Sequence, residues 1–194
     1  MPEAGEDDRA LVAAAQHAPH RFEPLFRRYW EPVLRYCALR LGRDEAEDVA
    51  SEVFVAAYAG LPRFRDRGED GSGSFRSWLF TIAHHEVANR HRYRARHPAH
   101  PWTDDAAGIA DPDGSPERAA LAADERARLL ALLEQLPERS REVVALRLAG
   151  LTDREIADVL GIRGDAVRQA QSRAIAQLRT LLGPNPNWKW NGDD

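Results

Sequence analysis

The segment Leu151–Arg179 constrains the fold of this chain more than any other stretch. Apolar residues recur in it at helical spacing in two runs, with only four residues between them. Thr152 and Glu155 have the spacing of a capping box, which marks the start of the first helix. Gly161 stands at the turn and permits a positive φ there. The pattern predicts a helix-turn-helix, whose second helix can enter the major groove of DNA.

The second helix of this segment presents polar side chains opposite its apolar face. Arginine and glutamine can make bidentate contacts with base edges, and serine or arginine can bind phosphate. The alternative is an ordinary α-helical hairpin with a solvated polar face. We predict that four residues contact DNA: Arg168, Gln169, Ser172 and Arg173.

Composition limits the class of protein. No apolar run approaches the ~20 residues of a membrane span, and the acidic N-terminus is unlike a signal peptide, so we expect a cytoplasmic protein without membrane insertion. Cys37 is the single cysteine, which excludes a disulfide framework and is typical of a small core residue. The net charge of −4 is unfavourable for DNA binding unless basic and acidic surfaces are separate.

Helical periodicity continues through most of the chain, and no strand-like alternation persists. We therefore predict an all-α protein of two helical domains joined by an acidic linker rich in proline and glycine, with the helix-turn-helix in the second domain. Asp44 is expected to cap one helix of the first domain and Ser74 another. The predicted divisions are an N-terminal domain (1–97), a linker (98–117), a C-terminal domain (118–183) and a tail (184–194).

Two charged stretches of the N-terminal domain suggest binding surfaces. Glu45, Asp48 and Glu52 form an acidic stripe at helical spacing without matching lysines, which favours a basic protein partner. The segment 84–96 interleaves histidines and arginines with Tyr93, a combination suited to phosphate contact and base stacking. Its alternative explanation is a solvated basic helix end favoured by the helix dipole.

Four motifs, in this order, resemble the bacterial extracytoplasmic-function sigma factors, a group of RNA polymerase specificity subunits. Together with the helix-turn-helix they span about Phe22 to Leu182. The motifs are FEPLFRRY (22–29), DEAEDVASEVF (44–54), SFRSWLFTIA (74–83) and LPERSREV (136–143).

The resemblance implies a function in promoter recognition. The acidic stripe would dock on a basic coiled coil of the largest subunit of core RNA polymerase, and the second helix of the helix-turn-helix would read the minus-35 element of promoter DNA. An anti-sigma factor is a further candidate partner, and no cofactor, metal or catalytic residue is implied. His84, His85 and Asn89 depart from residues common in the family, so base specificity is not carried over. The residues implied in minus-10 recognition and strand opening are Phe64, His84, His85, Asn89, Arg90, Arg92 and Tyr93.

Two other functions are compatible with parts of the sequence. A helix-turn-helix regulator acting without core polymerase would explain residues 151–179 but would leave the acidic stripe without a role. An enzyme with a metal site at His84, His85 and Glu86, beside the carboxylates of the stripe, is the second alternative. Adjacent histidines diverge by ~100° on a helix, which makes joint ligation of one metal difficult.

Overall fold

The computed structural model describes residues 7–66, 73–97 and 127–182, and these ranges contain helices and no strand. The predicted all-α class is confirmed, whereas the predicted linker (98–117) and tail (184–194) lie outside the described residues. The N-terminal helices are α1 (Asp8–His17), α2 (Glu23–Leu41), α3 (Arg43–Gly60) and α4 (Phe75–Arg96), with short 3₁₀ turns η1 (Pro19–Phe22) and η2 (Leu61–Arg63). The C-terminal helices are one over residues 127–134, then α6 (Glu138–Leu148), α7 (Asp153–Leu160) and α8 (Gly164–Leu182).

Side chains cap the starts of three described helices: Asp7 before α1, Ser74 before α4 and Thr152 before α7. The Ser74 side chain accepts a hydrogen bond from the Ser77 amide at the start of α4, as predicted. The predicted cap at Asp44 is wrong, because α3 already begins at Arg43. Gly42, with φ of 86°, ends α2 and turns the chain directly into α3, so Asp44 lies inside the first turn.

The helix-turn-helix forms as predicted. Thr152 and Glu155 make both bonds of the capping box at the start of α7. Gly161 ends α7 in the left-handed conformation, with φ of 61° and ψ of 36°. The face of α8 that packs against α6 and α7 buries Val167, Ala170, Ala174 and Leu178.

Gly161 offers a clean stability prediction, because an added Cβ atom would meet nothing within 4 Å. Gly161→Ala should therefore lower the free energy of unfolding by about 1–2 kcal/mol through the left-handed backbone alone. Gly164→Ala is the matched control three residues later, where the backbone is not left-handed and the Cβ would lie 3.7 Å from Arg168 Nη1. Urea denaturation should show the control unchanged or up to ~1 kcal/mol more stable. Equal effects of both substitutions would contradict this prediction.

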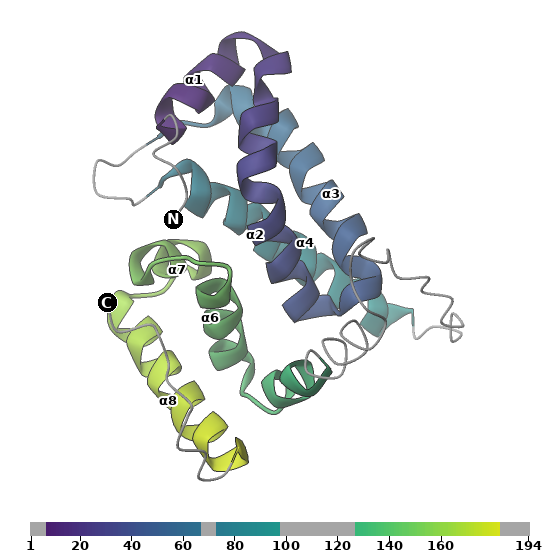
Figure 1. Ribbon diagram of the computed structural model, residues 1–194, viewed down its shortest axis with the longest axis vertical. Coiled ribbons are helices and arrows are strands. Elements are labelled where there is room, and N and C mark those ends of the chain that lie inside the picture. Colours follow the sequence, from purple (N-terminus) through teal and green to yellow (C-terminus); the bar gives the residue numbers. More distant parts are fainter. Residues whose placement is uncertain (1–6, 67–72, 98–126, 183–194) are drawn as a thin grey trace, which may run out of the picture.

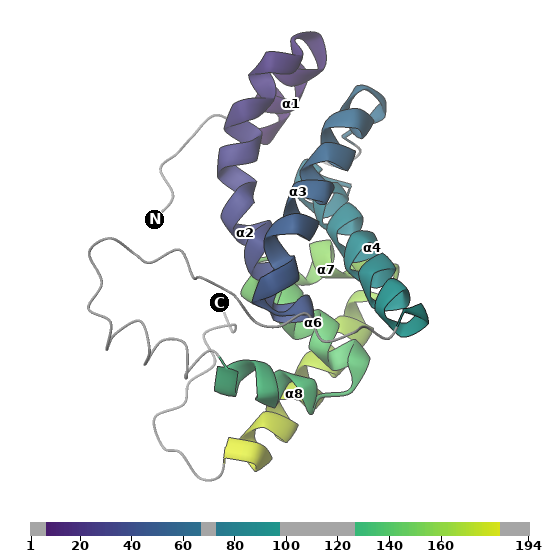
Figure 2. The same ribbon diagram turned by 90° about the vertical axis from the view of Figure 1, so that its right-hand side faces the viewer.

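The two groups of helices pack against each other. In Figures 1 and 2 the C-terminal helices lie beside the long helices α2 and α4. α7 contacts α4, and α6 contacts α2. One hydrophobic cluster is continuous across both groups, joining residues such as Leu79 and Ala83 with Val143 and Ile156. None of the described helices has the length and apolar character needed to cross a membrane.

Candidate nucleic-acid and polymerase interfaces

The outer face of α8 carries the predicted minus-35 residues. Their side chains are exposed, while the opposite face of the helix is buried, so all four point away from the core: Arg168, Gln169, Ser172 and Arg173. Two side chains of α6, Ser140 and Arg147, contact this helix. Ser140 Oγ donates a hydrogen bond of 3.2 Å to the Ala170 carbonyl, and Arg147 binds the Leu151 carbonyl at 2.9 Å and Gln171 Oε1 at 3.4 Å. The geometry is that of a helix whose inner face is supported by its neighbours and whose outer face is exposed.

The acidic stripe on α3 is matched by arginines that sequence periodicity did not reveal. Glu45 Oε1 lies 2.9 Å from Arg94 Nε, and Glu52 Oε1 lies 3.1 Å from Arg90 Nη2, both on α4. The expectation of an unmatched stripe is therefore wrong, because its partners come from another helix. Asp48 is exposed and, within the described part of the chain, forms no ion pair. It is the carboxylate of the stripe most available to a partner.

The basic end of α4 divides between two faces. Arg90 turns toward α3, whereas His85, Asn89, Arg92 and Tyr93 are exposed. Arg92 donates a hydrogen bond to Asn89 Oδ1. Tyr93 stacks on His97 with ring centroids 4.4 Å apart, which leaves an exposed pair of rings at the helix end. This outer face combines cationic, amide and aromatic groups in one place, as single-stranded nucleic acid requires.

Two further predicted minus-10 residues, besides Arg90, are not free in this arrangement. Phe64 is only 6% exposed and packs edge-on against Phe75 and tilted against Trp78, with centroids 5.9 and 4.9 Å apart. His84 points into the space between α4 and α6, where its Nε2 lies 3.9 Å from Glu142 Oε1 and its Nδ1 lies 3.1 Å from the Tyr36 hydroxyl. Contact of either side chain with DNA would require it to leave these partners.

The environment of His84 leads to a pH prediction. Burial, and next the charge of Arg40, lower the pKa of His84 below its ordinary value of 6.5, so the folded chain favours the neutral imidazole. As pH falls below about 6.5 the unfolded chain binds the proton more readily, and the free energy of unfolding decreases down to the lowered pKa. Between pH 7.5 and 5.5, the free energy of unfolding measured in urea should therefore decrease less for His84→Gln than for the wild type. His85→Gln, the exposed neighbour, is the control, and identical slopes for wild type and His84→Gln would contradict the prediction.

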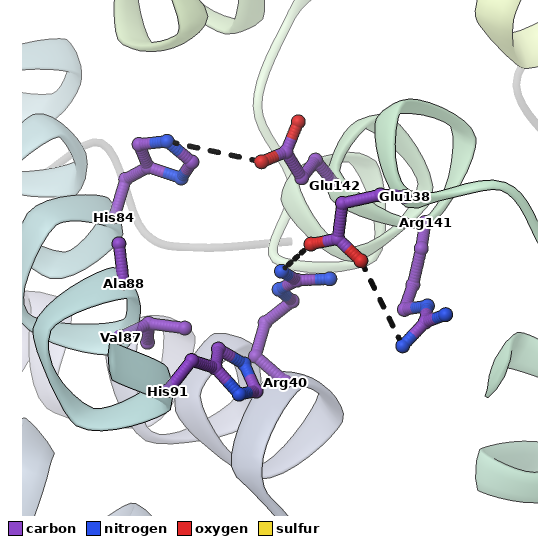
Figure 3. A pocket seen from close by; sticks show the side chains of 8 residues that line it. All are labelled: Arg40, His84, Val87, Ala88, His91, Glu138, Arg141 and Glu142. Atoms are coloured by element: carbon purple, nitrogen blue, oxygen red, sulfur yellow. Dashed lines mark hydrogen bonds and ion pairs between the residues drawn. The ribbon is translucent and has the colours of Figure 1, made fainter. Parts of the chain in front are cut away.

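A set of polar contacts joins the N-terminal and C-terminal helices, and we call it the seam. Arg40 of α2, whose side chain is 3% exposed, binds Glu138 of α6, as Figure 3 shows. Arg76 at the start of α4 donates a hydrogen bond to the Gly150 carbonyl, and its Nη1 lies 3.7 Å from Glu155 Oε2. These contacts were not predicted from the sequence. One signal was available, since Arg40 follows Tyr36 and Cys37 by four and three residues and so shares their buried face.

Cys37 is fully buried, and burial raises the pKa of its thiol to about 12. The thiol is therefore protonated at neutral pH and not poised as a nucleophile, which agrees with the core position expected for it.

Comparison with known proteins identifies relatives of both parts of the chain. Residues 25–97 match the family described as Sigma-70 region 2, and residues 126–178 match Sigma-70, region 4. The ECF RNA polymerase sigma factor SigD of Mycobacterium tuberculosis (strain ATCC 25618 / H37Rv) is 40% identical over 160 residues, which cover 76% of this chain and 70% of SigD. ShbA of Streptomyces griseus subsp. griseus, also an ECF RNA polymerase sigma factor, is 41% identical over 157 residues, which cover 76% of this chain and 80% of ShbA.

A solved structure is similar over nearly the whole chain. It is that of CnrH in complex with the cytosolic domain of CnrY, with 30% sequence identity and a TM-score of 0.68. The match covers 90% of this chain and 96% of that chain.

Proposed function

The chain belongs to the extracytoplasmic-function group of RNA polymerase sigma factors, and we propose that exposed faces of its α8 and α4 helices read the two elements of a promoter. In this proposal Arg168, Gln169, Ser172 and Arg173 contact the minus-35 element. The outer face of α4, with His85, Asn89, Arg92 and Tyr93, contacts the minus-10 element. The exposure of all four α8 side chains on a helix held by α6 and α7 is the observation that carries the proposal.

The proposed division of labour follows the two matched regions. The N-terminal domain (1–97) would bind core polymerase and the minus-10 element, and the C-terminal domain (118–183) would bind the minus-35 element. Residues 98–117 would connect them, and residues 184–194 would form a tail.

Reading both elements requires the two groups of helices to separate. The minus-35 and minus-10 elements lie about 25 base pairs apart, which is roughly 85 Å of duplex at ~3.4 Å per base pair. α4 is only about 33 Å long, and α7, the helix preceding α8, contacts it directly. The 29 residues of segment 98–126 can extend to about 100 Å, so the chain is long enough to bridge the elements once the seam opens. The arrangement in Figure 1 is therefore a closed form.

Opening would also remove one of the two contacts of the predicted minus-10 residue that faces the seam. His84 would lose Glu142 of α6 but keep its hydrogen bond to the Tyr36 hydroxyl of α2. Phe64 and Arg90 are held entirely by contacts within the N-terminal helices. Their proposed part in minus-10 binding requires a further local rearrangement.

Core polymerase is the proposed partner of the α3 stripe. The stripe would face a basic coiled coil of the largest polymerase subunit through Glu45, Asp48 and Glu52. Among the described residues no arginine pairs with Asp48, so its charge is available to the partner. A cytosolic protein domain acting as an anti-sigma factor is a second proposed partner, by analogy with the complex of CnrH and CnrY. We place this activity in the cytoplasm, where transcription occurs.

The mechanism requires no catalytic residue, cofactor or metal. Binding energy between protein and exposed bases would be exchanged for the energy of opening base pairs. A helix-turn-helix regulator acting alone is not favoured, because both the region 2 and the region 4 families match.

Run-off transcription tests the proposal. Bacterial core polymerase would be incubated with the promoter region upstream of the chain's own gene, with and without the chain. Promoter-specific transcripts that require the chain are expected. Gel shifts with and without core polymerase distinguish a sigma factor from a regulator that acts alone, since such a regulator would bind the same duplex tightly without polymerase.

A further inference from the structure

The first helix, α1, precedes residue 25, where the match to Sigma-70 region 2 begins, so the matched family does not account for it. It packs against α2, α4 and η2. Asp8, at its N-terminal end, binds Arg28 and Tyr29 of α2. Its inner face buries three apolar residues: Leu11, Val12 and Ala15. These contacts fix α1 on the other N-terminal helices.

One polar side chain of α1 reaches the short segment 61–66 between α3 and α4, which we call the Phe64 segment. The amide nitrogen Nε2 of Gln16 donates hydrogen bonds to the carbonyls of Leu61 and Phe64, both of 2.9 Å. The Gln16 side chain is partly buried, so water competes less for these bonds than at a fully exposed site. At the other end of the segment, Arg9 Nε lies 3.0 Å from Asp66 Oδ2. The segment is therefore bound to α1 at both ends.

The bonds from Gln16 stabilise the inward position of the Phe64 ring. In this position Phe75 and Trp78 of α4 cover the ring. The Phe64 amide also donates to the Leu61 carbonyl at 3.1 Å, which closes the turn over these residues. To carry the ring away from α4, the backbone at Phe64 must rotate, and this rotation would move both carbonyls away from Gln16.

We propose that Gln16 is a positioning residue of promoter opening, which holds Phe64 against α4 until minus-10 DNA competes for the ring. Loss of two hydrogen bonds should raise the population of the released segment roughly tenfold. DNA that binds only the released form would then be bound correspondingly more readily. The effect on opening rests on the proposed function, in which Phe64 takes part in minus-10 recognition. The hold of Gln16 on the segment does not depend on that function.

Hydrogen–deuterium exchange of the full chain tests the hold directly. Gln16→Met keeps a similar length and helix propensity but has no donor. The fold should survive, because the Leu61 carbonyl keeps the Phe64 amide as a donor and the Phe64 carbonyl keeps Arg65 Nη1 at 2.8 Å. Exchange of the Phe64 amide should become roughly tenfold faster, while exchange within α2 stays unchanged.

Gln177→Met is the matched control for this exchange experiment. It removes a hydrogen bond of the same kind, from Gln177 Nε2 to the Gln135 carbonyl at 2.7 Å, in the C-terminal helices. It should leave exchange at Phe64 unchanged. Unaltered exchange at Phe64 in Gln16→Met, or an equal acceleration in Gln177→Met, would overturn the proposal.

The effect on opening is measured with core polymerase and the promoter upstream of the chain's own gene, carrying 2-aminopurine in the minus-10 element. The rate of opening should rise several-fold with Gln16→Met and stay unchanged with Gln177→Met. A merely structural role of Gln16 predicts a slower rate instead, because loss of its bonds would only destabilise the domain. Phe64→Leu keeps an apolar side chain on α4 without the ring and should slow opening.

The outcomes separate this proposal from the proposed function. If Phe64→Leu slows opening but Gln16→Met does not accelerate it, the role of Gln16 in opening is overturned. If Phe64→Leu leaves the rate unchanged, the proposed part of Phe64 in minus-10 recognition fails, and the effect of Gln16 on opening fails with it. The exchange experiment contains neither polymerase nor DNA, so faster exchange in Gln16→Met would still support the hold on the Phe64 segment.

Discussion

Replacing Asp48 with arginine should weaken binding to core RNA polymerase roughly 100-fold. A positive side chain set against a basic polymerase surface costs several kcal/mol, and each 1.4 kcal/mol is about tenfold in affinity. Asp48 is the informative position because it is exposed and, among the described residues, in no ion pair. Glu52→Lys should also weaken binding, but it breaks the pair with Arg90 and so disturbs α4 as well.

The control is Glu31→Arg, an identical charge change at an exposed position on α2. Fluorescence anisotropy of labelled chain titrated with core polymerase, at ~0.1 and ~0.5 M salt, measures both variants. The loss with Asp48→Arg should shrink at the higher salt, because screening weakens exposed charge pairs. Equal affinities of Asp48→Arg and Glu31→Arg for core polymerase would show that the stripe is not part of the polymerase interface.

Features that depend on neighbours along the chain were predictable. The capping box of Thr152 and Glu155, the turn at Gly161 and the polar face of α8 all rest on spacings of three or four residues. Residues at such spacings lie on the same face of a helix, so the sequence alone identifies which side chains share a surface.

Features that depend on packing between helices were not predictable. Arg94 and Glu45 are 49 residues apart, and Arg40 and Glu138 are 98 apart, so no periodicity links them. The burial of Phe64 has the same origin, because Phe75 and Trp78 of α4 cover the ring. The closed form and the seam arise from such long-range contacts.

Removing both arginines of the recognition face, Arg168→Ala with Arg173→Ala, should nearly abolish transcription from promoters that depend on the minus-35 element. Each arginine that binds a base edge contributes about 1–3 kcal/mol, and a phosphate contact contributes through release of bound cations. Both side chains are exposed and lie opposite the buried face of α8, so their removal should not destabilise the domain. Run-off transcription and thermal unfolding of the double variant measure the two effects.

The single variants then assign a role to each arginine. If Arg173 binds a base edge, Arg173→Ala relaxes the preference at one promoter position. If it binds a phosphate, the same substitution weakens binding to all sequences alike and lowers the salt dependence by about one ion. Arg27→Ala is the control, since Arg27 is an exposed arginine of α2 that pairs with Glu23 at 2.6 Å and belongs to neither α4 nor α8. If Arg27→Ala lowers transcription as much as the double variant, general charge and not the α8 face governs promoter binding. If only the double variant loses transcription while its Tm is unchanged, the minus-35 contacts reside on α8.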